Sequence, residues 1–150
     1  MTQLTLAKPE HFDVLIKLVE DFHREEGVES TETTRREGLM PLLEGSPHGA
    51  VYIAGPTRAP IGYAIICFGW SLEFGGLDGF VDEIFIRPGV RGRGIGTEIM
   101  LSLPKTLAKA GMRAIHLEVD RENSKARKLY EKMGFAPRER YMLMTRRFDD

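Results

Sequence analysis

Residues 80–100 read Phe-Val-Asp-Glu-Ile-Phe-Ile-Arg-Pro-Gly-Val-Arg-Gly-Arg-Gly-Ile-Gly-Thr-Glu-Ile-Met. The apolar run over 80–86, interrupted only by two acids, is typical of a buried strand, and the Pro-Gly pair at 88–89 ends it. A glycine-rich turn follows at 91–96, and apolar residues then recur at helical spacing up to Leu107. This stretch therefore predicts a strand that leads through a glycine-rich turn into a helix.

The glycine-rich turn has the features of an anion-binding site. The first N–H groups of a helix have no partner inside the helix, and the helix dipole makes this end positive. Glycines at 92, 94 and 96 leave these N–H groups uncovered, and Arg91 and Arg93 add positive charge. A diphosphate is the natural ligand for such a turn.

Two common phosphate-binding motifs fit this turn poorly. A P-loop requires a lysine after its last glycine, and none stands there. The dinucleotide-binding pattern Gly-x-Gly-x-x-Gly, started at Gly92 or Gly94, ends on Thr97 or Ile99. Glu118 lies near the distance expected of a ribose-binding acid, which keeps this second motif open as a weak alternative. The structural alternative is a turn that only closes a strand-to-helix corner.

The composition is that of one ordinary globular domain spanning residues 1–150. A net charge of -1 gives no electrostatic reason to expect nucleic acid or a membrane surface as a partner. No run approaches the roughly 20 apolar residues of a membrane span, and we see no signal peptide. The only cysteine, Cys67, allows no disulfide within the chain and is expected to be a small buried hydrophobe. We therefore expect a cytoplasmic protein.

Periodicity predicts the remaining elements. Strands are expected at 2–7, 49–54, 61–70, 114–119 and 141–148, and helices from Pro9 to about Glu26 and from about 30 to 43. Pro104 is expected to kink or split the helix that follows the glycine-rich turn. His23, Glu25 and Glu26, near the end of the first helix, are expected to be solvated, with contact to a substrate as the alternative.

A second informative pattern lies at 123–135, Asn-Ser-Lys-Ala-Arg-Lys-Leu-Tyr-Glu-Lys-Met-Gly-Phe. Its asparagine is a suitable helix cap, and its glycine is a suitable helix stop. Together the two patterns resemble those of the GNAT superfamily of N-acetyltransferases, Arg-x-x-Gly-x-Gly followed by Asn-x-x-Ala-x-x-Leu-Tyr-x-x-x-Gly-Phe. The matching positions are Arg91, Gly94, Gly96, Asn123, Ala126, Leu129, Tyr130, Gly134 and Phe135.

The resemblance implies an α/β fold with a central, mixed, mostly antiparallel sheet, a V-shaped splay between two strands and about four flanking helices. It also implies acetyl-CoA as cosubstrate, without a metal. The main chain of Ile84, Phe85 and Ile86 would bind the pantetheine arm. The residues implied at the diphosphate are Arg91, Gly92, Arg93, Gly94, Ile95, Gly96 and Thr97, and those implied near the cofactor arm are Asn123 and Tyr130.

Acetyl transfer to an amine needs a group that takes the ammonium proton, donors for the oxyanion of the tetrahedral stage and an acid for the leaving thiolate. Tyr130 is the candidate acid by its place in the pattern. Asp82 is preferred over Glu83 as base or amine anchor, by similarity to diamine acetyltransferases. Strand alternation is expected to point the two acids to opposite faces. The alternative for either acid is an ion pair with an arginine.

These observations predict an acetyl-CoA-dependent N-acetyltransferase that acts by direct transfer on a primary amine. A small cationic amine is favoured as acceptor, and a peptide or lysine amine is the second option. A non-catalytic acyl-CoA sensor is the alternative from another class, because it would keep the loop and lose the proton-transfer groups. A homodimer is compatible with the sequence but not required by it.

Overall fold

The computed structural model describes residues 2–148 and divides the chain into two compact units, residues 1–118 and 119–150. The first unit holds all five strands, β1 (Leu4–Leu6), β2 (Gly49–Ala54), β3 (Gly62–Ser71), β4 (Gly76–Ile86) and β5 (Ala114–His116). It also holds the helices α1 (Phe12–Glu26), α2 (Glu32–Leu43) and α3 (Ile95–Lys109), with the 3-10 turns Pro9–His11 and Pro88–Val90. The second unit contains α4 (Ser124–Lys132).

The strands form one mixed sheet in the order β1-β2-β3-β4-β5. The first four pair antiparallel, and β5 runs parallel to β4. This parallel pairing joins only Asp78–Phe80 of β4 to Ala114–His116, so β4 continues for six residues without a partner strand on that side among the described residues. The expected fold class, including the parting of two strands, is confirmed.

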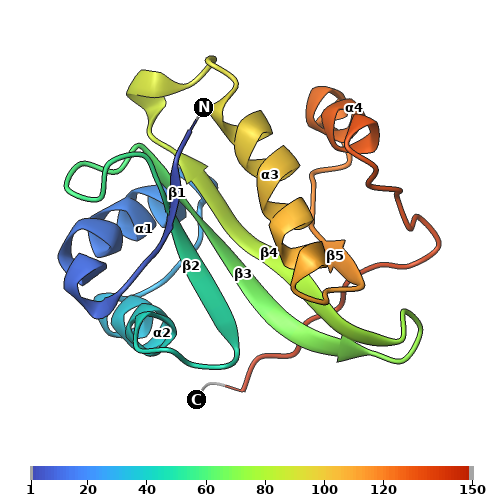
Figure 1. The fold of residues 1–150 in the computed structure, drawn as a ribbon, viewed down its shortest axis with the longest axis horizontal. Coiled ribbons are helices and arrows are strands. Elements are labelled where there is room, and N and C mark those ends of the chain that lie inside the picture. The colour runs from blue at the N-terminus through green and yellow to red at the C-terminus, as the bar shows by residue number, and fades with distance from the viewer. Residues whose placement is uncertain (1, 149–150) are drawn as a thin grey trace. The chain divides into compact units, whose positions relative to one another are not determined.

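Helices cover both faces of this sheet (Figure 1). On the α1 and α2 face, apolar side chains of the two helices pack on those of β2, β3 and β4 in one core. The residues of this core include Leu15, Val19, Leu39, Leu43, Ile53, Tyr63, Ile65 and Phe85. On the other face α3 buries Ile99, Met100, Leu103 and Leu107.

The helix ends follow their sequence signals. Gly27, at φ 70°, ends α1 in the left-handed conformation that favours glycine, and the side chain of Thr31 caps α2. Of the two effects expected of Pro104, the split is wrong, because α3 runs unbroken from Ile95 to Lys109. Burial of apolar side chains on both sides of the proline offsets the missing hydrogen bond. No helix of the described residues is long and apolar enough to cross a membrane.

The strand expected at 141–148 is also wrong, because these residues form neither helix nor strand. Their large apolar side chains are exposed, from 59% at Tyr141 to 87% at Phe148. A strand needs a partner for its backbone groups, and the alternation seen in the sequence does not supply one.

Candidate functional site

An extra residue in β4 decides where its two acids point. In the pairing of β3 with β4, Val81 lies opposite Ile66 and Glu83 lies opposite Ile65. Asp82, between them, has no partner on β3. Such a β-bulge interrupts the alternation of side chains along a strand.

Both carboxylates consequently lie on the α1 side of the sheet. Glu83 contacts His23 of α1. The charge of Asp82 acts on Tyr63 and Cys67, which belong to or pack against the core on that side. The expectation that the two acids point to opposite faces is wrong, because it assumed a strand without a bulge.

Both oxygens of Glu83 are engaged. The Tyr63 hydroxyl donates to Oε1 at 2.8 Å, and Nε2 of His23 lies 2.6 Å from Oε2. The other imidazole nitrogen, Nδ1, lies 2.7 Å from Oγ of Ser30, which also accepts from Nη1 of Arg35 at 3.0 Å. Glu83 is thus the last acceptor in a chain of hydrogen bonds that runs from α2 through α1 to β4. One acid does have a basic side chain as its partner, but that partner is a histidine and not an arginine.

The end of α1 is less solvated than its sequence indicates. His23 is only 14% exposed at its side chain, so the expectation of a solvated residue is wrong there. The reason is that the last turn of α1 lies against β4, which a helix-face pattern cannot show. Glu25 is 40% exposed and pairs with Arg91, and Glu26 is exposed as expected.

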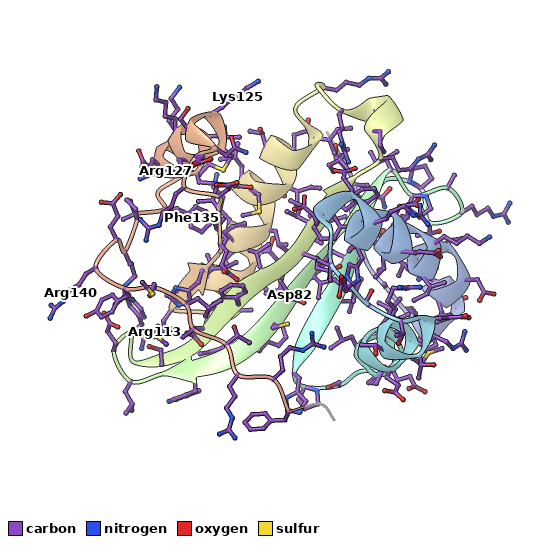
Figure 2. The ribbon with its side chains drawn as sticks, turned by 180° about the vertical axis from the view of Figure 1, so that it is seen from behind. Asp82, Arg113, Lys125, Arg127, Phe135 and Arg140 are labelled. Carbon is purple, nitrogen blue, oxygen red and sulfur yellow. The ribbon has the colours of Figure 1, made fainter. Side chains whose placement is uncertain are left out.

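Asp82, in the middle of β4 (Figure 2), has the opposite surroundings to Glu83. Its residue is exposed and forms no hydrogen bond with another described residue. Partial burial of the carboxyl group raises the pKa of Asp82, and the charge of His23 opposes this. Asp82 is therefore a free carboxylate, and a stronger base than an ordinary aspartate.

Cys67 packs as a hydrophobic residue, although it is half-buried and not buried as expected. Burial, followed by the charges of Asp82 and Glu83, raises the pKa of its thiol. The side chain packs against the core under α1 and α2. A protonated, packed thiol is a poor nucleophile, so the structural interpretation of Cys67 is favoured.

The glycine-rich turn leaves the start of α3 uncovered. Gly94 is the N-cap at φ 77°, Gly92 lies at φ 80°, and no side chain caps the helix. The N–H groups of Ile95, Gly96 and Thr97 have no partner among the described residues. These three donors, at the positive end of a 15-residue helix, suit a diphosphate. The residues present therefore fit the group that the turn predicts.

The two arginines of this turn differ. Arg91 donates to Glu25 and to the main-chain carbonyl of Ile86. Arg93 is exposed and makes no hydrogen bond or ion pair with another described residue. Of the pair, only Arg93 has a guanidinium without a protein partner.

The unpaired side of β4 presents main-chain groups of two residues. The N–H of Arg87 donates to Ile61 of the preceding turn at 2.8 Å. Because the main-chain groups of alternate residues point the same way in an antiparallel pair, those of Phe85 also face β3. Those of Ile84 and Ile86 face the side where β5 has ended. Of the three residues expected along a pantetheine arm, two thus face the unpaired edge, where the carbonyl of Ile86 already accepts from Nε of Arg91.

In the second unit, the residues of the 123–135 motif contact one another. Oδ1 of Asn123 accepts from the N–H of Ala126 at 3.1 Å, which confirms the expected cap. The ring of Tyr130 meets Phe135 edge to face, with centroids 5.9 Å apart. Burial raises the pKa of Tyr130, so its phenol stays protonated at neutral pH.

Sequence analysis missed Tyr63 and Ser30. The signal for Tyr63 was a hydroxyl in the otherwise apolar run of a buried strand, since a buried tyrosine hydroxyl usually finds a polar partner. Tyr63 is 0% exposed. Ser30 offers no such signal, because serine is ordinary before a helix.

Comparison with known proteins gives a consistent result. A family model described as "Acetyltransferase (GNAT) family" matches residues 14–135. The bovine (Bos taurus) thialysine N-epsilon-acetyltransferase is 26% identical over 131 residues, 86% of this chain and 71% of that protein. An uncharacterized N-acetyltransferase of Methanocaldococcus jannaschii is 39% identical over 59 residues, 39% of this chain but only 26% of that protein's length.

A solved structure is similar over almost the whole chain. It is an integron cassette protein from the mobile metagenome of Cole Harbour Salt Marsh, with a TM-score of 0.82 and 28% identity. The match covers 99% of this chain and 91% of that one.

The contrast between the two acids predicts opposite effects on stability. Glu83→Ala leaves the buried Tyr63 hydroxyl without an acceptor, and we expect a loss of about 1–3 kcal/mol in the free energy of unfolding. Asp82→Ala removes a carboxylate whose pKa is raised in the folded state. As the pH rises from the ordinary aspartate pKa through the raised one, ionisation of Asp82 lowers the free energy of unfolding, and above both values the whole of this loss is present. Asp82→Ala removes this loss, so the variant should be at least as stable as the wild type at pH 7. Urea denaturation of the two variants measures both effects, and equal losses would contradict the assignment.

Proposed function

We propose that this chain, which belongs to the acetyltransferase (GNAT) family, transfers the acetyl group of acetyl-CoA directly to a primary amine. The observation that carries the proposal is the free carboxylate of Asp82, which bulges from the same strand that has an open main-chain edge at Ile84 and Ile86. An N-acetyltransferase needs this combination, because the amine must lose a proton where the thioester is held.

The cofactor-binding part of the proposal rests on the turn and the strand. The main chain of residues 92–97 would hold the diphosphate, and Ile84 and Ile86 would hydrogen-bond the pantetheine arm. Bound acetyl-CoA supplies the thioester carbonyl that the amine attacks. We also assign Asn123 and Tyr130 to the cofactor arm, on the strength of their place in the family's second motif.

A small cationic amine is the acceptor that the charges favour. Besides Asp82, β4 carries Glu83, which is paired with His23, and Asp78, which contacts His116 at 3.2 Å. Asp82 remains available to attract an ammonium group. The bovine relative is named for acetylating thialysine, a small amine, which supports this choice.

Two residues would move protons in the reaction. Asp82 takes a proton from the ammonium group, so that the nitrogen gains the lone pair with which it attacks; its raised pKa strengthens it as a base. Tyr130 gives the phenolic proton to the departing thiolate, and the second proton that the nitrogen loses as the amide forms passes to solvent, from which Tyr130 is reprotonated. A phenol is protonated at neutral pH, so Tyr130 carries the proton that the thiolate needs.

A screen of amines tests the function. We expect release of free CoA thiol when the protein is mixed with acetyl-CoA and small cationic amines, including thialysine, lysine and polyamines, and weaker release with peptides. The measurement is thiol titration with a coloured disulfide reagent, and mass spectrometry identifies the acetylated nitrogen. Cofactor binding without thiol release across all acceptors would favour the sensor instead.

Conservative variants test the two proton-transfer roles. Asp82→Asn and Tyr130→Phe should each lower kcat by roughly 10²–10⁴, the usual contribution of a general base or acid, while the KM for acetyl-CoA changes little. In the wild type, kcat/KM for the amine should fall at low pH through a pKa above the ordinary aspartate value, and Asp82→Asn should lose this acidic limb. Unchanged turnover of Tyr130→Phe would remove its role as acid.

A substitution of Gly96 can distinguish an effect on CoA binding from an effect on stability. It lies in α3 with an ordinary helical φ, and the atom nearest to an added Cβ is a side-chain carbon of Ile86 at 4.0 Å. Gly96→Ala should therefore leave the melting temperature unchanged or raise it, because alanine favours helices by up to about 1 kcal/mol.

The same methyl group would stand over the uncovered N–H groups. We expect about a ten-fold weaker binding of CoA, which corresponds to one lost charge-assisted hydrogen bond. Gly38→Ala, in α2 with nothing within 4 Å of the added Cβ, is the matched control and should bind CoA as the wild type does. Calorimetric titration with CoA measures the difference, and equal affinities of the two variants would contradict a diphosphate site at Gly96.

A further inference from the structure

Arg91 opens the glycine-rich turn, yet its side chain is held by the protein itself. Nη2 donates to both carboxylate oxygens of Glu25, at 2.9 and 2.7 Å. Nε donates to the carbonyl of Ile86 at 2.8 Å. The guanidinium carbon also lies 5.5 Å from the ring centroid of Phe85.

These contacts join three elements that the site depends on. Glu25 belongs to the last turn of α1, Ile86 and Phe85 end β4, and Arg91 begins the turn that leads into α3. The carbonyl of Ile86 is part of the open edge of β4, so Arg91 touches the main chain at the place where the cofactor arm is proposed to lie.

The same turn of α1 holds β4 at two further points. The ring of Phe22 lies 5.6 Å from that of Phe85, and His23 binds Glu83, next to Asp82. A change in the position of this turn would therefore reach both the carboxylates and the open strand edge.

We propose that Arg91 is a positioning residue and not a diphosphate ligand: with Glu25 as its anchor, it clamps the last turn of α1 to the open end of β4 and so holds the cofactor-binding edge in place. This inference rests on the proposed function. Arg93, whose guanidinium has no partner among the described residues, is left as the charged side chain for the diphosphate.

The geometry favours a clamp over a latch that would open to meet the cofactor. The guanidinium uses two of its nitrogens, Nη2 for Glu25 and Nε for the carbonyl of Ile86, and the single ammonium of a lysine could not hold both. To reach a phosphate, Arg91 would give up both bonds to Glu25, the bond to Ile86 and the contact with Phe85. Its charge is also already neutralised by Glu25, which reduces its attraction for an anion.

Substitution of Glu25 distinguishes a positioning role of Arg91 (the clamp) from release of Arg91 to bind the cofactor (the latch), because the two predict opposite changes in acetyl-CoA binding. Glu25→Gln should lower kcat/KM for acetyl-CoA by about five-fold or more, a loss typical of a weakened charge-assisted contact, with an unchanged melting temperature. Glu26→Gln, the adjacent exposed residue, is the matched control and should behave as the wild type. A latch predicts the reverse, because freeing Arg91 would strengthen binding of acetyl-CoA. Stronger or unchanged binding in Glu25→Gln overturns the clamp.

Lysine substitutions test the same proposal, because they keep the positive charge and remove the guanidinium. Lysine keeps the charge and can bind phosphate, but its single nitrogen cannot hold Glu25 and the carbonyl of Ile86 together. Arg91→Lys should therefore match Glu25→Gln, and the double variant should be no worse than either single one. Arg93→Lys should retain most of the affinity for CoA, while Arg93→Gln should weaken it and reduce its salt dependence. A near-wild-type Arg91→Lys overturns the clamp.

Titration of the wild type with CoA distinguishes failure of the clamp from failure of the function. If the wild type and Glu26→Gln do not bind CoA, the proposed function is overturned, and the clamp with it. If both bind CoA and Glu25→Gln binds equally well with unchanged kcat/KM, only the clamp is overturned.

Discussion

One unpaired residue in β4, Asp82, is the constraint on which the site depends. Counted from Phe80, which lies opposite Cys67, regular alternation would turn Glu83 and Phe85 to the face under α3, where a carboxylate costs several kcal/mol unless it is paired. The bulge turns Asp82 and Glu83 to the same side. It also lets the strand resume its alternation, so that Phe85 enters the core under α1 while Ile84 and Ile86 keep their main-chain groups toward the open edge.

Two adjacent carboxylates have different properties because of what surrounds them. Glu83 receives hydrogen bonds on both oxygens and links β4 to α1 and α2. Asp82 receives none from the described residues and keeps an exposed position. The paired acid stabilises the strand that carries the free one. We therefore regard Glu83 as part of the framework and Asp82 as the group available to an acceptor amine.

The last turn of α1 connects the parts of the site in the first unit. Phe22, His23 and Glu25 contact, in that order, the ring of Phe85, the carboxylate of Glu83 and the guanidinium of Arg91. The glycines of the turn also differ in what they do. The positive φ of Gly92 and Gly94 requires glycine at these positions. Gly96 has no such conformational requirement, so the lack of a side chain there indicates that space is needed for a ligand.

The sequence alone was sufficient for the fold class and the family, because both depend on local patterns. Alternation and helical spacing predicted most strands and helices, and glycine and asparagine signals predicted the ends of α1 and α4. The two motifs, each continuous in sequence, are by themselves enough to indicate an acetyltransferase. Each of these features depends on residues that lie close together in the sequence, so each can be predicted from the sequence alone.

Only the tertiary structure decided what the site residues do. The bulge at Asp82 depends on register with β3, which no pattern within β4 reveals. The roles of His23, Tyr63 and Glu25 depend on partners 60, 20 and 66 positions away in the chain. The residues at 141–148 failed as a strand for the same reason, since alternation describes one side of a pairing and the partner lies elsewhere. Contacts between distant segments are set by tertiary packing, which local patterns in the sequence do not reveal.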